Sequence, residues 1–215
     1  MSYFIIGDLH GCYYTLLKML ENWNSEREYL IFAGDLIDRG NFSAAVVIKC
    51  IELTEKNRNC LVIKGNHEAE FIEYFEKGEN ENWIRQCGQK TLDNFTLEQV
   101  DNKKVSDWFK KMPLSFETAS LLVTHAGISE TENPYEENNE DGVLWNRKEL
   151  KNIGKLQIHG HTPLLKYKPQ FNENSNSWNV DTGAYYGYGL TGLKVSEDGK
   201  LLATITVETD KKDIQ

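Results

Sequence analysis

The stretch FIIGDLHG, residues 4–11, starts as an apolar run and then abruptly presents Asp8 and His10 beside two glycines. Such a run is typical of a short buried strand. A carboxylate and an imidazole two residues apart, where the strand ends, indicate either an ordinary turn or a functional site, because Asp and Gly are common turn residues. The rest of the chain decides between these two interpretations.

Length and composition favour one globular domain. The chain has 215 residues, 40% hydrophobic and 27% charged, which is enough to bury a substantial core. We expect the domain to span residues 1–210, with a frayed tail at 211–215. No stretch approaches the length that spans a membrane, and no basic segment precedes the first apolar run, so we expect a cytoplasmic protein without a membrane partner.

Charge and cysteine usage exclude several classes of site. The formal net charge of −9 disfavours a surface that tracks nucleic-acid phosphates, so nucleic acid is not an expected partner. Cys12, Cys50, Cys60 and Cys87 lie far apart and form no C-x-x-C pair. We therefore expect buried thiols in a reducing compartment rather than a zinc or redox motif. Any phosphate that this protein binds must be met by a local positive centre.

The first third of the chain predicts a parallel sheet. Apolar runs at residues 3–6, 29–33 and 60–63 resemble short buried strands, and each is followed by Gly-Asp or Gly-Asn within a few residues. Helical periodicity at residues 13–23 and 44–53 separates these runs. Strands that alternate with helices in this way indicate a βαβαβ unit, and hence an α/β fold.

The remainder of the chain predicts a helical segment followed by more strands. Residues 68–112 have a largely helical pattern, and we expect them to lie over one end of the sheet. Further strands are expected at residues 121–124, 156–158, 178–181, 190–195 and 201–207. Turns link most of them, which favours antiparallel pairing. The acidic stretch at residues 132–142 has the composition of a solvated loop.

Polar motifs follow the predicted strands. GDLHG occupies residues 7–11, GDLIDRG residues 34–40 and GNHE residues 65–68, while THAG and HGHTP follow two later strands. Parallel strands bring their carboxyl ends to one edge of a sheet, where open α/β folds bind ligands. The side chains expected to converge there are Asp8, His10, Asp35, Asn66, His67, His125 and His161.

This convergence predicts a metal site. All five histidines of the protein fall inside these motifs. Carboxylate, amide oxygen and imidazole ligands without a thiolate suit Mn²⁺, iron or Zn²⁺. Six candidate ligands exceed what one open catalytic ion needs, so two ions about 3.5 to 4 Å apart, sharing a carboxylate, fit better.

The ordered set GDLHG, GDLIDRG, GNHE, HAG and GHTP resembles the metal-dependent serine/threonine phosphoprotein phosphatases, in their bacterial and phage branch of the bacteriophage lambda type. The resemblance extends over nearly the whole chain. It implies a calcineurin-like fold, in which two mixed β-sheets pack as a sandwich flanked by helices in a single domain. It also implies a dinuclear metal centre at the strand ends, for which we expect manganese, with iron or zinc as alternatives.

The resemblance also assigns ligands by matched position. The first ion would be held by Asp8, His10 and Asp35. The second would be held by Asp35 as the bridge, together with Asn66, His125 and His161.

Catalytic roles follow in the same way. His67 matches the general acid of the family and Asp38 its carboxylate partner, while Arg39 and Arg147 match the arginines that bind phosphate. Asn66 is also expected to lie against the substrate. Arginine suits this task because its planar guanidinium bonds two phosphoryl oxygens at once. An ion pair with the acidic loop is the alternative interpretation of Arg147.

Three features depart from the family pattern or have no assigned role. In residues 82–92, Gln86 and Cys87 stand where the bacterial branch has Asn and Gly. His159 lies two residues before His161, so a strand would place both on one face; we expect His159 to support the site or to pack. Asp181 matches a stretch near the site and is expected to play a structural or supporting role.

The expected function is hydrolysis of phosphoserine and phosphothreonine monoesters in proteins, with phosphotyrosine as a further substrate, by direct attack of a metal-bridging hydroxide. One alternative is a symmetrical dinucleoside polyphosphate hydrolase, which relatives in the same family exemplify. Another is a non-catalytic metal-binding regulator, which the complete set of matched positions disfavours. A nuclease is the least favoured, because the chain is acidic and has no basic stretch interleaved with aromatic residues.

Overall fold

Strand β1 (Ser2–Ile6) lies in the middle of a five-stranded sheet and is buried on both faces along its second half. Phe4 and Ile6 contribute to a core shared with the helices, whereas Ile5 contributes to a second core shared with the other sheet. Side chains alternate between the two faces of a strand, so one continuous apolar run serves two layers. This double burial explains why the opening stretch shows no polar alternation. The computed structural model describes residues 1–78 and 80–215.

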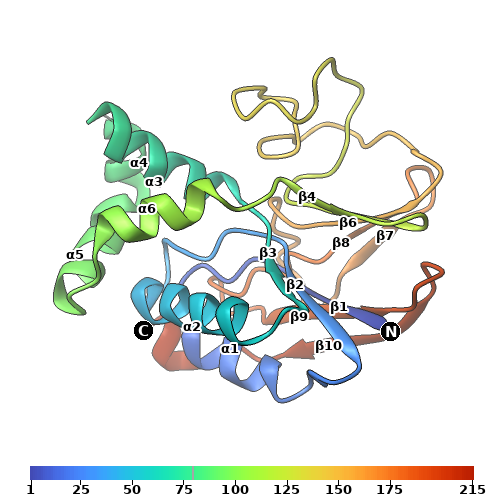
Figure 1. The fold of residues 1–215 in the computed structure, drawn as a ribbon, viewed down its shortest axis with the longest axis horizontal. Coiled ribbons are helices and arrows are strands. Elements are labelled where there is room, and N and C mark those ends of the chain that lie inside the picture. The colour runs from blue at the N-terminus through green and yellow to red at the C-terminus, as the bar shows by residue number, and fades with distance from the viewer. Residues whose placement is uncertain (79) are drawn as a thin grey trace.

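The predicted βαβαβ unit is confirmed. β2 (Glu28–Phe32) pairs in parallel with β1, and β3 (Cys60–Val62) pairs in parallel with β2. Helix α1 (Tyr13–Leu20) and helix α2 (Ser43–Lys56) connect these strands and lie together on one face of the sheet (Figure 1). The three strands therefore deliver their carboxyl ends to one edge, as the sequence predicts.

Two late strands complete the first sheet. β9 (Leu190–Val195) pairs antiparallel with β1, and β10 (Leu201–Val207) pairs antiparallel with β9. The sheet order is β10-β9-β1-β2-β3. The last third of the chain thus returns beside the first strand.

A second five-stranded sheet has the order β4-β5-β6-β8-β7. Its strands are β4 (Ser115–Glu117), β5 (Leu121–Thr124), β6 (Leu156–His159), β7 (Gln170–Asn172) and β8 (Ser177–Asn179). Apolar residues from β1, β2, β5, β6 and β9 form one shared core between the sheets, which gives the predicted sandwich. The antiparallel prediction holds only for part of this region, because β5, β6 and β8 run parallel.

A block of helices follows β3 and stands to one side of the sheets (Figure 1). Its members are α3 (Asn66–Lys77), α4 (Glu81–Trp83), the π-helix η1 (Ile84–Gly88), α5 (Gln89–Leu97) and α6 (Asn102–Lys110). Phe71, Trp83, Phe95 and Phe109 are fully buried in its interior. The helical segment expected at 68–112 is thus helical over most of its length; residue 79 within it lies outside the described residues.

The prediction of a frayed tail is wrong. Residues 211–213 form a short 3₁₀ helix, η2 (Lys211–Asp213), and the Asp213 side chain is fully buried. Its carboxylate accepts hydrogen bonds from the backbone N–H groups of Tyr14 and Thr15 at 3.0 and 2.8 Å, and from the Thr15 hydroxyl at 2.6 Å. Helix α1 has no cap from the residue before it, Cys12, so the tail supplies one from the other end of the chain.

The same tail also contacts the loop that follows β2. Asn41 donates its backbone N–H to the carbonyl of Asp213 at 2.9 Å, and its side-chain amide to the carbonyls of Lys212 and Gln215. The short, polar tail is therefore ordered by hydrogen bonds to two distant segments. Across the described residues, every helix is too short or too polar to cross a membrane.

The cap predicts a measurable contribution of Asp213 to stability. Asp213→Ala leaves two helix N–H groups and a buried hydroxyl without their acceptor, and should lower the free energy of unfolding by about 2 to 3 kcal/mol. Urea denaturation measures this change. Asp107→Ala, on the outer face of α6, is the control and should leave stability nearly unchanged. Equal stability of the wild type and Asp213→Ala would show that the docked tail does not support helix α1.

Candidate metal centre

Sharp turns at the strand ends aim the predicted site residues toward one another. His10, Asp35 and His161 have positive φ angles of 43°, 52° and 70°. Residues other than glycine rarely adopt this left-handed conformation, and when they do it is often at functional sites. The turn at His161 also explains why His159 does not join it, because the strand alternation stops at the end of β6.

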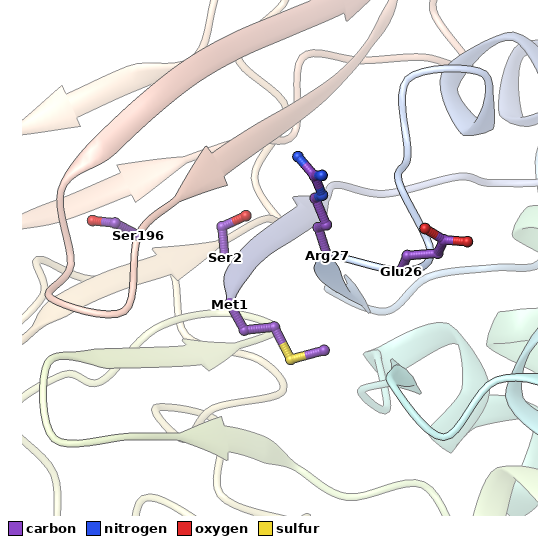
Figure 2. A pocket seen from close by; sticks show the side chains of 5 residues that line it. All are labelled: Met1, Ser2, Glu26, Arg27 and Ser196. Carbon is purple, nitrogen blue, oxygen red and sulfur yellow. The ribbon is translucent and has the colours of Figure 1, made fainter.

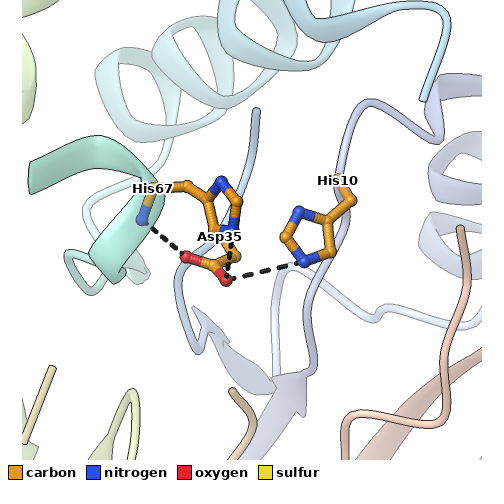
Figure 3. Close-up of side chains that lie close together, drawn as sticks. All are labelled: His10, Asp35 and His67. Atoms are coloured by element: carbon orange, nitrogen blue, oxygen red, sulfur yellow. Dashed lines mark hydrogen bonds and ion pairs between the residues drawn. The ribbon is translucent and has the colours of Figure 1, made fainter. Parts of the chain in front are cut away.

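Asp35 lies at the centre of the convergent side chains. Its Oδ2 atom is 3.5 Å from His10 Nε2, and its Oδ1 atom is 3.4 Å from His125 Nε2. The backbone N–H of His67 donates to Oδ1 at 3.1 Å (Figure 3). Asp35 belongs both to a group with His10 and His67 and to a group with His125 and His161. Its position is thus the one expected of a bridging carboxylate.

Backbone hydrogen bonds fix the orientation of three histidine rings. Each ring places one nitrogen against a backbone carbonyl, and the tautomer that donates there leaves a lone pair on the other nitrogen, facing the centre. The bonds measure 2.8 to 3.2 Å and run from His10 to Ile37, from His125 to Ala33 and from His161 to Trp145. Metal-binding histidines in proteins are oriented in the same way.

The lone pairs of His125 and His161 face other acceptors. His125 Nε2 and His161 Nδ1 lie 3.2 Å apart, and each is 2.9 Å from Asn66 Oδ1. With the ring tautomers set by the backbone, three acceptors crowd one buried point without a proton between them. Such groups repel one another unless a cation lies among them. The donor set therefore fits a metal ion.

Asp8 gives a second, independent indication. Its Oδ2 atom accepts the backbone N–H of His161 at 3.0 Å, but Oδ1 is buried and has no partner among the described residues. A Cβ atom at Gly160 would overlap this oxygen, so only glycine leaves room for it. Burial, together with the nearby Asp181 and Asp35 carboxylates, raises the pKa of Asp8 well above its usual range. A bound cation would satisfy the oxygen and stabilise its charge.

The protonation of the cluster suits cation binding. Burial lowers the pKa values of His10 and His125, and lowers that of His161 to about 2, so all three rings are neutral at pH 7. Burial alone would raise the pKa of Asp35, but the surrounding histidines outweigh it and lower the pKa. Neutral imidazoles and an ionised carboxylate are the forms that ligate metals.

The geometry therefore allows two adjoining metal sites. Asp8, His10 and Asp35 could hold one ion. Asp35, Asn66, His125 and His161 could hold a second. All of these side chains are buried, and they come from the ends of β1, β2, β3, β5 and β6.

His67 lies beside this cluster but has a different partner. Its Nδ1 atom is 2.5 Å from Asp38 Oδ2, which is a short hydrogen bond, and its Nε2 atom faces the centre, 3.9 Å from Asp35 Oδ2. Burial would lower the pKa of His67, but Asp35 and Asp38 outweigh it and raise the pKa well above its usual range. The raised pKa favours the protonated ring, which could donate its Nε2 proton toward the centre once the Arg39 guanidinium, 3.2 Å from Nε2, turns to an anion.

Two arginines flank the centre. Arg39 lies between two rings, with its guanidinium nitrogens 3.0 Å from His10 Nε2 and 3.2 Å from His67 Nε2. Arg147 is exposed and approaches the hydroxyl of Thr162 at 3.4 Å. No carboxylate of the described chain pairs with Arg147, so the ion-pair interpretation has no support. Arg147 is thus available for an anion, while Arg39 would have to exchange a ring contact for one.

Two hollows differ in their relation to the centre. One, of about 380 Å³, is lined by Arg147, Thr162 and His159 together with other polar residues. It adjoins the metal-ligand cluster through Thr162, the neighbour of His161. The other, of about 590 Å³, lies at the amino end of β1 around Met1, opposite to the end that carries the cluster (Figure 2). Only the first is placed to contact a molecule bound at the centre.

Glu68, the last residue of GNHE, has a supporting role that its sequence motif alone does not reveal. Its buried carboxylate accepts the backbone N–H groups of Gly65, Asp35 and Leu36, each at 2.9 Å. Glu68 therefore joins the start of α3 to the loop that carries Asp35. Burial and the Asp35 charge raise the pKa of Glu68 to about 7. The sequence signal was a Glu three residues after a helix start, which is typical of a capping box.

His159 and Asp181, the two residues without a firm role, lie at the margin of the metal-ligand cluster. His159 places Nδ1 near the carbonyl of Gly160 at 3.1 Å, and burial lowers its pKa to about 4. Asp181 is buried and accepts the backbone N–H of Gly183 at 3.0 Å. Burial raises the pKa of Asp181 to about 6. Neither side chain takes part in the acceptor cluster.

Comparison with known proteins agrees with this geometry. The family model for calcineurin-like phosphoesterases matches residues 1–192. The asymmetrical bis(5'-nucleosyl)-tetraphosphatase PrpE of Bacillus subtilis is 27% identical, over 92% of this chain and 92% of that protein. Serine/threonine-protein phosphatase 2 of Salmonella typhimurium is 29% identical, over 89% of this chain and 91% of that protein.

A solved structure shares the fold. The cold-active protein-tyrosine phosphatase of a psychrophilic Shewanella species superimposes with a TM-score of 0.68 over 95% of this chain and 80% of that chain, at 18% sequence identity. The relatives thus carry names of both protein phosphatases and dinucleotide hydrolases.

The shared carboxylate predicts how metal binding depends on Asp35. Elemental analysis of the manganese-reconstituted protein should give about two ions per chain. Asp35→Ala should lose both ions, whereas Asp8→Ala should retain one, because Asp8 belongs to only one of the two sites. Asp107→Ala is the control for the loss of a carboxylate elsewhere. A wild-type protein that saturates at one ion would contradict the two-site geometry.

Proposed function

The chain belongs to the calcineurin-like phosphoesterase family, and we propose that within this family it hydrolyses phosphoserine and phosphothreonine monoesters in proteins. The general reaction, metal-dependent hydrolysis of phosphoesters, follows from the family and from the metal-ligand cluster. The preference for phosphoprotein substrates rests on one observation, the buried pair formed by His67 and Asp38.

This pair supports a substrate with a poor leaving group. A serine or threonine alkoxide is strongly basic and must receive a proton as the P–O bond breaks, whereas a nucleotide leaves as a stable phosphate anion. The 2.5 Å hydrogen bond between His67 and Asp38, in a site from which water is largely excluded, holds a protonated imidazole beside the centre. An acid of this kind benefits monoesters of alcohols far more than polyphosphates.

The proton transfer can be followed atom by atom. The Nδ1 proton stays on His67, which donates it to Asp38 in their hydrogen bond. The proton that moves is therefore the one on Nε2. It passes to the serine or threonine oxygen as the bond between that oxygen and phosphorus breaks. His67 then becomes neutral and regains a proton from solvent before the next turnover.

The arginines would bind the phosphoryl group. Arg39 and Arg147 approach the centre from different loops, and their fixed charges suit the oxygens that gain negative charge in the transition state. Divalent ions at Asp35, for which manganese is the proposed occupant, would supply an activated water molecule and neutralise phosphoryl charge. While no cation is bound, Arg39 donates to the lone pair of His10 that an ion would use.

Hydrolysis of dinucleoside polyphosphates is the second candidate. It is supported by the tetraphosphatase among the relatives and by the hollow beyond Arg147, whose mixed polar and apolar lining offers room for a second part of a substrate. A panel of phosphoserine, phosphothreonine and phosphotyrosine peptides with diadenosine tetraphosphate, compared by kcat/KM on the manganese-loaded protein, separates the two candidates. A preference for the dinucleotide would overturn the proposal.

The role of His67 predicts a substrate-selective defect. His67→Asn should lower kcat for a phosphoserine peptide by about 10² to 10⁴-fold, the usual range for general acid catalysis. It should affect p-nitrophenyl phosphate much less, because p-nitrophenolate leaves without a proton. Asp38→Asn should show the same selectivity in weaker form.

Metal content measured on the same samples controls for a change in ion binding, since neither His67 nor Asp38 is a proposed ligand. An equal loss on both substrates at full metal occupancy would remove His67 from the role of leaving-group acid.

The phosphate-binding role of the arginines predicts a second set of effects. Arg39→Ala and Arg147→Ala should each lower kcat/KM by about 10²-fold or more, because each removes a charge aimed at the transition state. Arg85→Ala, an exposed arginine in the π-helix η1, is the matched control and should have a weaker effect. If the three variants had equal activity near that of the wild type, neither Arg39 nor Arg147 would be a phosphate ligand.

A further inference from the structure

The part of the helical block formed by α4, η1 and α5 contacts the general acid through Asp38, a residue that is not itself in the reacting centre. Asp38 is fully buried, and three side chains from this block direct polar hydrogens at its carboxylate. Trp83 Nε1 donates to Oδ2 at 2.7 Å, Thr91 Oγ1 donates to Oδ1 at 2.5 Å, and Cys87 Sγ lies 3.4 Å from Oδ2. With His67, four donors surround one carboxylate.

The spacing of these donors depends on the π-helix. Trp83, Cys87 and Thr91 are each four residues apart, and in a regular α-helix such a series drifts around the axis by about 40° per step. The π-helix between Trp83 and Thr91 contains more residues per turn and offsets this drift, so all three side chains reach the same carboxylate. Gly88 is required here, because a Cβ atom would overlap the Trp83 indole ring.

We propose that Trp83, Cys87 and Thr91 are positioning residues for His67, acting through Asp38. They hold the Asp38 carboxylate in one orientation, so that Oδ2 meets the Nδ1 proton of His67 and the Nε2 proton faces the scissile phosphoryl group. The inference rests on the proposed function, in which His67 is the acid. It assigns to the helical block a role in catalysis rather than only that of a cover.

The energetics favour this role over simple packing. A carboxylate that is fully removed from water is strongly destabilised unless hydrogen bonds replace its hydration. Bonds from N–H and O–H groups to an ionised oxygen are short and roughly twice as strong as neutral ones. Because Trp83 and Thr91 bond different oxygens, together they also prevent rotation of the carboxylate.

The bacterial branch of the phosphatases that this sequence resembles has glycine at the position of Cys87. Burial raises the pKa of the Cys87 thiol, so it remains an S–H donor at pH 7. The thiol also lies 3.8 Å from His67 Nδ1, but that nitrogen already donates to Asp38. The sulfur therefore adds a weak third donor from the helical block, and we expect its contribution to be the smallest of the three.

Variants that remove one donor with little change of shape test the proposal. Thr91→Val and Trp83→Phe should each lower kcat for a phosphoserine peptide by about 10-fold, while p-nitrophenyl phosphate turnover changes by less than about 3-fold. Thr91→Ser keeps the hydroxyl and should restore the peptide activity. Cys87→Ala should lower it by about 2-fold to 3-fold. Thr96→Val, on the same helix but bonded to the Leu92 carbonyl, is the matched control.

A spectroscopic readout makes the test independent of substrate and metal. The Nδ1 proton of His67 should give a far-downfield proton NMR signal in the metal-free protein, identified by its absence in His67→Asn. Thr91→Val and Trp83→Phe should shift or broaden this signal, and Thr96→Val should not. An unchanged signal, or losses that are equal on both substrates, would overturn the proposal.

The substrate preference and the Nδ1 signal, measured together, distinguish the positioning role from the proposed function. If the wild type prefers diadenosine tetraphosphate but the Nδ1 signal still depends on Thr91 and Trp83, the proposed substrate is wrong and the positioning contact is real. If His67→Asn is selective for the peptide but the signal does not respond to Thr91 or Trp83, the acid is confirmed and its positioning by the helical block is refuted.

Discussion

Repulsion between buried acceptors at one edge of the sandwich is the constraint on which the rest of the site depends. The ring nitrogens of His125 and His161 and the amide oxygen of Asn66 face one another at 2.9 to 3.2 Å, beside the Asp35 carboxylate. The outer ring nitrogens of His125 and His161 are bonded to backbone carbonyls, so these rings cannot turn away without losing those bonds. A bound cation would reconcile this arrangement with burial. The cluster thus fits a positive charge that its own side chains do not supply.

Two separate sets of structural elements surround this centre. The strand-end turns and the start of α3 carry the candidate ligands, while α4, η1 and α5 hold Asp38, which in turn bonds His67. Metal ions held by the ligands would activate water and neutralise phosphoryl charge in any phosphoester. In the proposed function, the contacts to Asp38 matter only when the leaving group needs a proton. On this proposal, the preference for a phosphoprotein over a dinucleotide depends more on α4, η1 and α5 than on the metal centre.

The sequence predicted the convergent residues well because strand-end motifs combine two local signals. An apolar run followed by Gly and a polar ligand residue indicates both the end of a strand and its direction, so Asp8, Asp35 and Asn66 could be placed together without a structure. Glu68 belongs to the same GNHE motif as Asn66, but its role depends on backbone N–H groups from a different loop, which the motif does not indicate. The Asp213 cap was missed for a similar reason, since a polar residue near a chain end looks solvated until its distant partners are known. The parallel pairing of β5, β6 and β8 was missed because long loops rather than helices connect these strands.

Anomalous X-ray scattering from crystals of the manganese-loaded protein would locate the ions. We expect two anomalous peaks, one on each side of the Asp35 carboxylate: the first against Asp8 and His10, the second against Asn66, His125 and His161. A single peak, or peaks elsewhere with the three acceptors still in mutual contact, would contradict the two-site geometry.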